Sequence, residues 1–524
     1  MTAHSPMFHV KPGRITVPHH ENAAALFAHL GGVERTDTLL LESADIESKK
    51  NTACMAILRS AARVTCSGND VIVTALSPTG TAILERLNGQ LNSYIHNSTE
   101  EETVFRFPPT TEHDERKRLQ AISNAEVLRK LQSEAGYQGD TLPLLGGGFA
   151  FDYLETYEVL PAVVPGPNTF PDYQFLVAET LLLIDHLSQT ASVEAINISE
   201  KALADDLAAT KAAIASFTTP LATAPNPEAG VLTARPDSTD DQFRKHVALM
   251  QEHIRQGDIY QVVPARAFST TCPDAFAAYQ ALRITNPSPY MFYMNGVNDA
   301  GAYELLGASP ESNLKFDTHD RTVQLYPIAG TRPRGLNPDG SINHELDIRA
   351  ELDMRTDAKE IAEHTMLVDL ARNDLARVAV PATRKVADLL QVDRYSRVMH
   401  LVSRVIATLD PNCDCLDAYR ACMNMGTLTG APKLKAIELL RSVETTRRGS
   451  YGGAVGYLKG DGSMDTCIVI RSAFVQNGIG IVQAGAGVVR DSQPQSEADE
   501  TLHKAYATLN AIATAQHKKL EVLR

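Results

Sequence analysis

The stretch 451–489 decides the fold class, with YGGAVGYL at 451–458, TCIVIRSAFV at 466–475 and IGIVQAGAGVV at 479–489. Each run has the length and the β-branched or small apolar content that is typical of a strand. The last two runs are separated by Asn477-Gly478, which is the strongest short signal for a hairpin turn. These three runs therefore predict an antiparallel meander near the C-terminal end.

Helical segments and further strands precede this meander. Phe243, Val247, Met250 and Ile254 recur at helical spacing, and Gly257 ends this predicted helix before the strand-like IYQVVPAR at 259–266. In the first half, strand-like runs (DTLLLESADI at 37–46, ARVTCSGNDVIVTAL at 62–76) are followed by strong helix formers (KALADDLAATKAAIASF at 201–217). Mixed helices and antiparallel strands predict α+β layers rather than a doubly wound parallel sheet.

One segment separates the chain into two regions. TTPLATAPNPEAGVLTARPDS at 218–238 is rich in Pro, Ala and Thr and has no sustained period. Such composition is typical of a connector. We therefore expect an N-terminal region at 1–217 and a C-terminal region at 239–524.

Composition excludes several classes of function. The 524 residues carry 49 Lys and Arg against 63 Asp and Glu, a net charge of −14, with no long basic run. Nucleic-acid or anionic-membrane binding is therefore not expected as the main task. The seven cysteines show no paired CxxC spacing, and neither a signal peptide nor an 18-residue apolar stretch occurs. We expect a reduced, cytoplasmic protein. The chain also contains no Trp.

Two ExxE pairs are candidate metal ligands. Glu360 and Glu363 lie in RTDAKEIAEHTMLVDLARND (355–374), and Glu497 and Glu500 lie in SEADET near the C-terminus. Residues at i and i+3 share a helical face, where a solvated surface is the more common interpretation of one pair. Two pairs facing one cavity would offer the oxygen ligands that Mg²⁺ prefers. Spacing alone leaves both interpretations open.

The remaining motifs are ambiguous on their own. GTLTGAPK (426–433) and QAGAG (483–487) could expose backbone N–H groups to an anion, but neither matches a nucleotide-binding loop, and turns that need Gly are the simpler interpretation. His400 lies in the apolar run RVMHLVSRV, where a hydrogen-bonded core histidine is more common than a catalyst. No GxSxG or GxCxG nucleophile elbow occurs in the chain.

Taken together, these and other strings resemble the family of anthranilate synthase component I, from the bacterial tryptophan pathway, in order and spacing. They are LLLESAD (39–45), NPSPYMF (286–292), GASPES (307–312), PIAGTRPRG (327–335), DLARNDLARV (369–378), MNMGTLTGAPK (423–433), YGGAVGY (451–457), CIVIRSA (467–473) and QAGAGVV…PQSEADET (483–501). The resemblance extends from residue 37 to about 515. It implies an α+β fold of large antiparallel sheets packed as a sandwich with helices outside.

Two positions bear on the subclass of this wider, chorismate-using family. Aminodeoxychorismate synthases carry a nucleophilic Lys where this chain has Ala329, and isochorismate-forming members place a water-activating Lys where it has Gln261. An amide does not serve as a general base near neutral pH. Both differences favour ammonia as the nucleophile and anthranilate as the product. An aminodeoxychorismate or isochorismate synthase, and a non-catalytic tryptophan-binding regulatory subunit, are the alternatives.

The resemblance also implies an active site and a Mg²⁺ cofactor. Glu363 and Glu500 match direct metal ligands, while Glu360 and Glu497 match residues that hold the ion's waters. Glu311 resembles the acid that protonates the leaving 4-hydroxyl, His400 the residue of the final elimination, and Thr427 a residue lining the pocket. Arg471 matches a clamp for a substrate carboxylate. The other implied chorismate-binding residues are Gly330, Thr331, Tyr451, Gly485, Ala486 and Gly487.

Regulation and partnership follow from the same resemblance. Without a glutaminase motif, the chain is expected to use ammonia itself and to receive it from glutamine only through a partner amidotransferase subunit, component II, in a heterotetramer. Feedback inhibition by L-tryptophan is expected at a site between the two regions, although a buried strand is the preferred interpretation of LLLES on spacing alone. The residues of this allosteric site are Glu42, Ser43, Pro289, Tyr290 and Met291.

Overall fold

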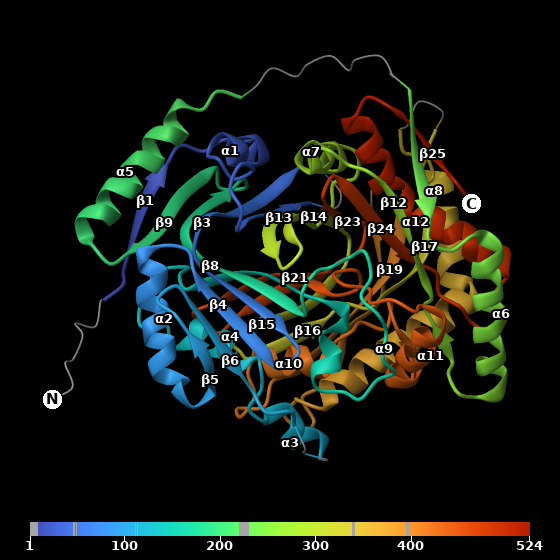
Figure 1. Ribbon diagram of the computed structural model, residues 1–524. Coiled ribbons are helices and arrows are strands. Elements are labelled where there is room, and N and C mark those ends of the chain that lie inside the picture. The colour runs from blue at the N-terminus through green and yellow to red at the C-terminus, as the bar shows by residue number, and fades with distance from the viewer. Residues whose placement is uncertain are drawn as a thin grey trace.

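The computed structural model describes residues 9–45, 48, 50–110, 112, 114–219, 230–337, 341–394 and 398–524. These residues form an α+β fold in which almost all strands belong to two antiparallel layers with helices around them (Figure 1). The predicted fold class is confirmed.

The first layer, sheet I, is joined edge to edge in the order β1–β9–β8–β3–β2–β13–β14–β23–β24–β12–β10–β25. All its pairs are antiparallel except β10 with β25. Its strands are β1 (Lys11–Val17), β9 (Thr190–Asn197), β8 (Tyr173–Asp185), β3 (Asn51–Ser67), β2 (Thr38–Ala44), β13 (Tyr290–Asn298), β14 (Gly301–Ser309), β23 (Ser472–Gln476), β24 (Ile479–Gly485), β12 (Ala265–Thr271), β10 (Val231–Pro236) and β25 (Lys519–Val522).

The second layer, sheet II, has the order β5–β6–β4–β3–β8–β7–β21–β22–β15–β16–β19. Strand β17 pairs with the first half of β19, beyond β16, and β18 pairs along most of the length of β19. The remaining bounds are β5 (Ile95–Ser98), β6 (Glu102–Arg106), β4 (Asp70–Ala75), β7 (Leu144–Phe149), β21 (Ala454–Lys459), β22 (Met464–Ile468), β15 (Ser312–Asp317), β16 (Thr322–Leu325), β19 (Val398–Thr408), β17 (Ile328–Pro333) and β18 (Lys385–Arg394).

Two long strands, β3 and β8, belong to both layers. The first half of β3 pairs with β2 and its second half with β4, while β8 pairs along its whole length. Register shifts between Ile57 and Ala62 bend the strand where it passes from one layer to the other. The N-terminal and C-terminal regions also share both layers, because β2 pairs with β13 and β7 pairs with β21.

Strand β13 illustrates how sheet I separates two apolar cores. Phe292 and Met294 belong to the core that extends between the layers, whereas Met291 and Tyr293 belong to the core under the outer helices. The alternation follows from the two-residue period of a strand. Four helices cover the outer face and lie along the upper side of Figure 1: α1 (Ala23–His29), α5 (Glu200–Ser216), α7 (Ala275–Thr285) and α12 (Pro494–Ala515).

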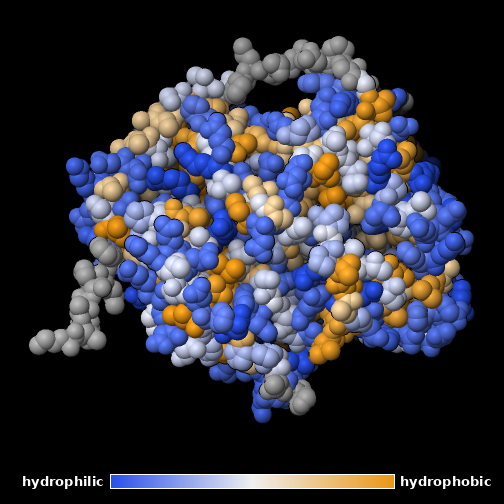
Figure 2. Space-filling model, in the orientation of Figure 1, coloured by the Kyte–Doolittle hydropathy of each residue, from blue (hydrophilic) through white to orange (hydrophobic). Residues whose placement is uncertain are grey.

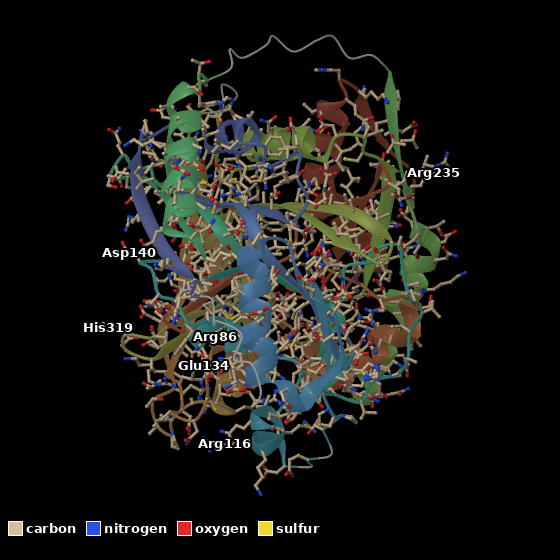
Figure 3. All side chains as sticks on the ribbon, turned by 60° about the vertical axis from the view of Figure 1, so that its left-hand side comes forward. Arg86, Arg116, Glu134, Asp140, Arg235 and His319 are labelled. Atoms are coloured by element: carbon tan, nitrogen blue, oxygen red, sulfur yellow. The ribbon has the colours of Figure 1, made fainter. Side chains whose placement is uncertain are left out.

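The other helices surround sheet II and the end of the sandwich that carries the candidate site. Arg86 of α2 donates through Nε to the main-chain oxygen of Glu134, 2.9 Å away, and so fastens α2 to the end of α4 (Figure 3). A short pair, β11 (Gln261–Val262) with β20 (Gly430–Ala431), stands apart from both sheets. These helices are α2 (Pro78–Gln90), α3 (Glu115–Gln120), α4 (Glu126–Ser133), α6 (Asp240–Gln256), α8 (His344–Thr356), α9 (Ala358–Ala376), α10 (Cys415–Cys422) and α11 (Lys433–Val443).

The predicted meander forms with one difference. The hairpin between β23 and β24 is confirmed: Gln476 pairs with Ile479, and both Asn477 and Gly478 have positive φ, as a two-residue hairpin turn requires. The run 466–475, however, is two strands rather than one. β22 pairs in sheet II and β23 in sheet I, so the chain crosses between the layers at 469–471.

The predicted connector is only partly described. Its residues 220–229 lie outside the described residues. Residues 231–236, which we expected to be irregular, form β10 in sheet I. Leu232 and Ala234 are buried while their neighbours are not, so the segment has the two-residue period of a strand that its Pro and Thr content obscured.

The face of the molecule shown in Figure 2 is predominantly polar. On the face shown in Figure 2, hydrophobic residues occur in small separate patches among hydrophilic ones. In the part of the chain that the structure describes, no helix is long and apolar enough to span a membrane.

Candidate active site

The candidate site is built where the chain crosses twice between the layers. One crossing joins β14 to β15 at 310–311, and the other joins β22 to β23 at 469–471. The two crossings are bonded to each other, because Ile468 N donates to Glu311 O (3.0 Å) and Ala308 N donates to Arg471 O (3.2 Å). The backbone therefore brings Glu311 and Arg471 together, as the resemblance implied.

Glu311 is a buried carboxyl group, 5% exposed. Burial raises its pKa to about 8, because an apolar environment disfavours the charged form, while a hydrogen bond from Thr427 and the cations Lys504 and Arg471 act in the opposite direction. Thr427 Oγ1 lies 3.2 Å from Glu311 Oε1. At neutral pH this carboxyl group holds its proton and is suited to act as a general acid.

Arg471 has an unusual backbone conformation, with φ of 51°. Burial lowers its pKa from the ordinary value, whereas Tyr451, Glu500 and Glu311 act in the opposite direction. Tyr451 is itself buried, and this burial raises its pKa to about 12. A guanidinium enclosed with few compensating carboxylates is suited to receive an anionic ligand.

His400 faces the same centre from β19. It lies opposite Thr331 of β17 in the strand register, and its Nδ1 is 2.8 Å from Thr331 Oγ1. Burial, together with the nearby cations Arg471 and Lys504, lowers the pKa of His400 to about 4. The imidazole is therefore neutral at physiological pH, in the form that accepts a proton.

The first predicted carboxylate pair lies at the start of α9. Glu360 Oε1 accepts from Arg332 Nη1 (2.7 Å), and Arg332 also bonds Asp353 and Asp357. Glu363 Oε1 accepts from Gln261 Nε2 (2.9 Å). Both carboxylates are therefore held by groups of the chain itself.

The second pair lies in the first two turns of α12. Glu497 is buried, and Glu500 forms an ion pair with Lys504 (2.6 Å), one turn further along the helix. Lys504 also donates to Gly485 O (3.0 Å) and influences the pKa of both Glu311 and His400. Our sequence analysis missed Lys504. The signal that could have found it is its i,i+4 spacing from Glu500.

The small residues allow the chain to approach these carboxylates closely. A Cβ on Gly487 would lie 3.0 Å from Gln261 Nε2 and 3.3 Å from Glu363 Oε1, and one on Gly330, where φ is +91°, would meet Leu401 and Glu360. A Cβ on Gly485 would lie 2.9 Å from Pro264 O. Ala486 differs from its neighbours: its N–H is already bonded to Pro264 O, and its side chain packs in an apolar cluster.

A second residue that the sequence analysis missed fixes β17 to α9. His364 is buried and lies with Nδ1 3.0 Å from Ala329 O and Nε2 2.6 Å from Ser403 Oγ. A carbonyl only accepts, so Nδ1 donates to Ala329, and Nε2 of the neutral ring accepts from Ser403. Burial lowers the pKa of His364, which favours this neutral form. Its position next to Glu363 is the only sequence signal.

The four glutamates do not form a ready-made metal cluster. Within the described residues, no three His, Cys, Asp or Glu side chains lie close enough together to hold a metal ion. Glu363 nevertheless lies beside Gly487, and Lys504, the partner of Glu500, donates to Gly485 O. The two predicted direct ligands, Glu363 and Glu500, therefore flank the short loop 485–487. Gln261 Oε1, next to Glu363, is buried without a hydrogen-bond partner.

A separate cavity of about 680 Å³ contains the residues of the predicted regulatory site. It is lined by Glu42 and Ser43 of β2, by Pro289, and by Tyr290 and Met291 of β13. The two strands are adjacent, with Met291 opposite Glu42. Its far wall comes from sheet II, including Tyr457 and Asp465, so the cavity lies between the two layers.

The carboxylate of Glu42 is hydrogen-bonded to α7, a helix outside this cavity. Its Oε2 accepts from Tyr279 Oη (2.7 Å) and Arg283 Nε (2.8 Å), and its Oε1 accepts from Arg283 Nη2 (2.8 Å). Both donors lie on α7. Asp465, another lining carboxylate, accepts from Tyr290 Oη (3.2 Å).

Comparison with known proteins shows the family of this chain. The chorismate binding enzyme family matches residues 86–510. Anthranilate synthase component 1 of Salmonella typhimurium (strain LT2) is 49% identical over 508 residues, 95% of this chain and 96% of that relative. The protein of the same name from Escherichia coli (strain K12) has the same identity and coverage.

Solved structures share the fold. Anthranilate synthase component I from Streptococcus pneumoniae TIGR4 has a TM-score of 0.69 at 27% identity, covering 89% of this chain and 94% of that chain. The menaquinone-specific isochorismate synthase of Escherichia coli has a TM-score of 0.63 at 20% identity, covering 96% and 94%. At the latter identity, the likeness concerns the fold alone.

Proposed function

This chain belongs to the chorismate binding enzyme family and, within it, to the anthranilate synthase component 1 enzymes, and we propose that it converts chorismate and ammonia to anthranilate, pyruvate and water. The observation that carries the proposal is the placement of a protonated acid, a buried guanidinium and a neutral imidazole around one centre. Glu311, Arg471 and His400 provide them, and each influences or is influenced by another's charge.

The chain's own groups suit the two steps of this reaction. In the first, ammonia forms a bond to C2 and the C4–O bond breaks, and Glu311 gives its proton to the departing hydroxyl so that it leaves as water. In the second, a base takes the C2 proton and the bond between the ring and the enolpyruvyl oxygen breaks, so that the ring becomes aromatic. The released enolpyruvate takes up a proton on its CH2 carbon and becomes pyruvate. His400 is the base we assign, because its low pKa keeps it neutral.

We assign substrate binding to the loops around this centre. Arg471 would bond a substrate carboxylate through its planar fork. Tyr451 stands beside it, and Gly330 with Thr331 forms the opposite wall next to His400. The backbone of Gly485 and Gly487 leaves room for a ligand because neither carries a Cβ.

We further propose Mg²⁺ as the cofactor, held by Glu363 and Glu500 directly and by Glu360 and Glu497 through water. The donor set fits, since it consists entirely of carboxylate oxygens. When bound, the ion would grip the ring carboxylate and stabilise negative charge as the hydroxyl leaves. Arg332 and Lys504 would have to share or release Glu360 and Glu500, because Arg332 bonds Glu360 and Lys504 bonds Glu500.

The product is distinguished from that of the alternatives by two positions. Ala329 has no nucleophile for the ring, as an aminodeoxychorismate synthase would need. Gln261 donates its amide to Glu363, so this side chain positions a carboxylate and does not activate water. Competent residues at each matched site position also disfavour a non-catalytic regulatory subunit.

A partner subunit is expected because the relatives are named as a first component. We propose that it is a glutamine amidotransferase, that it supplies ammonia, and that the two form a heterotetramer. The chain lacks a glutaminase nucleophile motif, which supports this division of labour. All seven cysteines are free and buried, which supports a reducing, cytoplasmic location.

L-tryptophan is the inhibitor we propose for the cavity at Ser43, Pro289, Tyr290 and Met291. The volume accommodates an indole, and apolar residues such as Leu41 and Phe292 form much of the wall. Asp465 offers a carboxylate to the ligand's ammonium group. Because Glu42 is bound to α7, its role would be to fix β2 rather than to contact the ligand by its carboxylate.

A product assay tests the proposed reaction. The purified chain is incubated with chorismate, Mg²⁺ and ammonium, and the products are separated by chromatography with fluorescence detection. We expect anthranilate and pyruvate in equal amounts, and no anthranilate when glutamine replaces ammonium. Isochorismate or a non-aromatic amine as the final product would overturn the proposal.

A further inference from the structure

A buried ammonium group joins three helices outside the site described above. Lys433, the first residue of α11, donates through Nζ to Asp374 Oδ2 of α9 (2.6 Å) and to the main-chain oxygen of Cys422, the last residue of α10 (2.8 Å). The side chains of Lys433 and Asp374 are only 9% and 8% exposed. An ion pair so enclosed is weak evidence of stability by itself, since desolvation opposes it.

The ammonium group of Lys433 links the two ends of the loop 423–432. The loop leaves α10 at Cys422, whose carbonyl Lys433 bonds, and returns to the chain at Lys433 itself. The same side chain therefore closes the base of the loop. Lys433 ends the string MNMGTLTGAPK and Asp374 ends DLARND, and both strings carry the resemblance to the family. The proposed reaction nevertheless gives neither residue a role.

The loop carries two contacts that reach the site. Thr427 donates to Glu311, and Gly430–Ala431 form the strand β20 that pairs with Gln261–Val262 of β11. Gln261 in turn donates to Glu363. A shift of the loop base would thus displace the hydrogen bond on the proposed acid and the amide on a proposed metal ligand.

Asp374, the carboxylate of the ion pair, lies near the end of α9. The first two turns of the same helix carry Glu360 and Glu363. The ion pair consequently fixes the loop against the helix that carries two of the four glutamates. Lysine suits the position, because its compact ammonium group can donate to a carboxylate and to a carbonyl in different directions, whereas the planar fork of Arg favours a bidentate partner.

We propose that Lys433 and Asp374 are positioning residues for catalysis: their ion pair fixes the loop 423–432 so that Thr427 donates to Glu311. This inference rests on the proposed function, because it concerns the acid of that reaction. Neither residue touches the substrate.

The test compares kcat of a variant in which Lys433 and Asp374 are both replaced by neutral residues with kcat of a variant that lacks the Thr427 hydroxyl. Lys433→Met alone would leave a buried carboxylate uncompensated, and the chain would be destabilised. The double variant K433M/D374N removes both charges with little change of volume. We expect it to remain folded, with kcat lowered about 10- to 100-fold, as misplacement of a catalytic group by about 1 Å does.

A double-mutant cycle with Thr427→Val separates positioning from a general loss of structure. If the pair acts through Thr427, adding T427V to K433M/D374N lowers kcat by less than about two-fold, whereas T427V in the parent chain lowers it strongly. The basic limb of the pH profile of kcat should also move to higher pH in both variants, because each loses a bond that stabilises the charged form of Glu311.

The matched control is another largely buried ion pair, Arg63 of β3 with Asp37, the residue before β2 (2.9 Å). R63M/D37N should leave kcat and the pH profile unchanged. The inference is overturned if K433M/D374N keeps the parent kcat and pH profile, or if T427V and the double variant act additively. A parent chain that forms no anthranilate would instead contradict the proposed function.

Discussion

The cavity at Ser43, Pro289 and Met291 and the centre at Glu311, Arg471 and His400 lie in the same sandwich but differ in the state of their polar groups. The cavity has about 680 Å³ of open volume, and the lining carboxylate of Glu42 is bonded outward to α7. In the centre, by contrast, the chain's own donors hold the proposed metal ligands. Arg332 bonds Glu360, Gln261 bonds Glu363 and Lys504 bonds Glu500.

This difference separates a preformed site from one whose bonds must be exchanged. A ligand can enter the cavity while Glu42 stays bonded to α7, so shape and apolar contact dominate its affinity. Binding of a cation in the centre requires the partners of Glu360 and Glu500 to give way. Strand β22 connects the two sites, because Asp465 and Cys467 line the cavity and Ile468 N bonds Glu311 O. A ligand that displaces β22 therefore acts on the acid.

The largest effect is expected in the centre, from His400→Gln. Removal of a general base slows its step by about 10² to 10⁴-fold. Amination does not use this group, so the amino intermediate should accumulate while anthranilate formation falls. Chromatography of the reaction mixture over time measures both. Equal loss of the two steps would contradict the assignment of His400.

Loss of one metal carboxylate should have the next largest effect. Glu363→Gln removes a charged ligand. We expect the Mg²⁺ concentration that gives half-maximal rate to rise at least about 100-fold. Glu438→Gln on α11, an exposed residue paired with Lys435, is the control and should be unaffected. If E363Q responded to Mg²⁺ like the parent chain, the centre would not be the metal site.

In the cavity, the corresponding change is Ser43→Phe, which places a ring in the open volume. We expect tryptophan affinity to fall at least about ten-fold, or about 1.4 kcal/mol. The chain has no Trp of its own, so the fluorescence of bound tryptophan is measured without background. Ser216→Phe, on the exposed end of α5, should bind tryptophan normally. Unchanged affinity in S43F would show that tryptophan binds elsewhere.

The smallest change expected is a displacement of the pH profile along the pH axis, which is measured separately from the rate itself. Glu311 acts in its protonated form, so kcat should fall as pH rises through about 8. Thr427 stabilises the charged form, and Thr427→Val therefore raises the pKa of Glu311 and moves this limb to higher pH. The rate is followed between pH 6 and 10 at saturating substrate, a range chosen as about two units either side of that pKa. A limb that moves to lower pH would exclude this hydrogen bond.

The sequence predicted the α+β class and the hairpin at Asn477-Gly478, and the resemblance pointed to Glu311, Thr427 and Arg471, which lie close together. It did not predict the break of 466–475 at the crossing, because an apolar run has the same pattern whether its strand stays in one sheet or passes to another. Lys504 and His364 escaped notice for a related reason. Their roles come from contacts with Gly485 and Ala329, which lie far from them in the sequence.

The most direct test of the account measures anthranilate formation against tryptophan concentration, at fixed chorismate, Mg²⁺ and ammonium, in the parent chain and in S43F. The account predicts Mg²⁺-dependent anthranilate formation that tryptophan suppresses in the parent chain and leaves almost unaffected in S43F. Absence of anthranilate, or equal suppression in both chains, would contradict it.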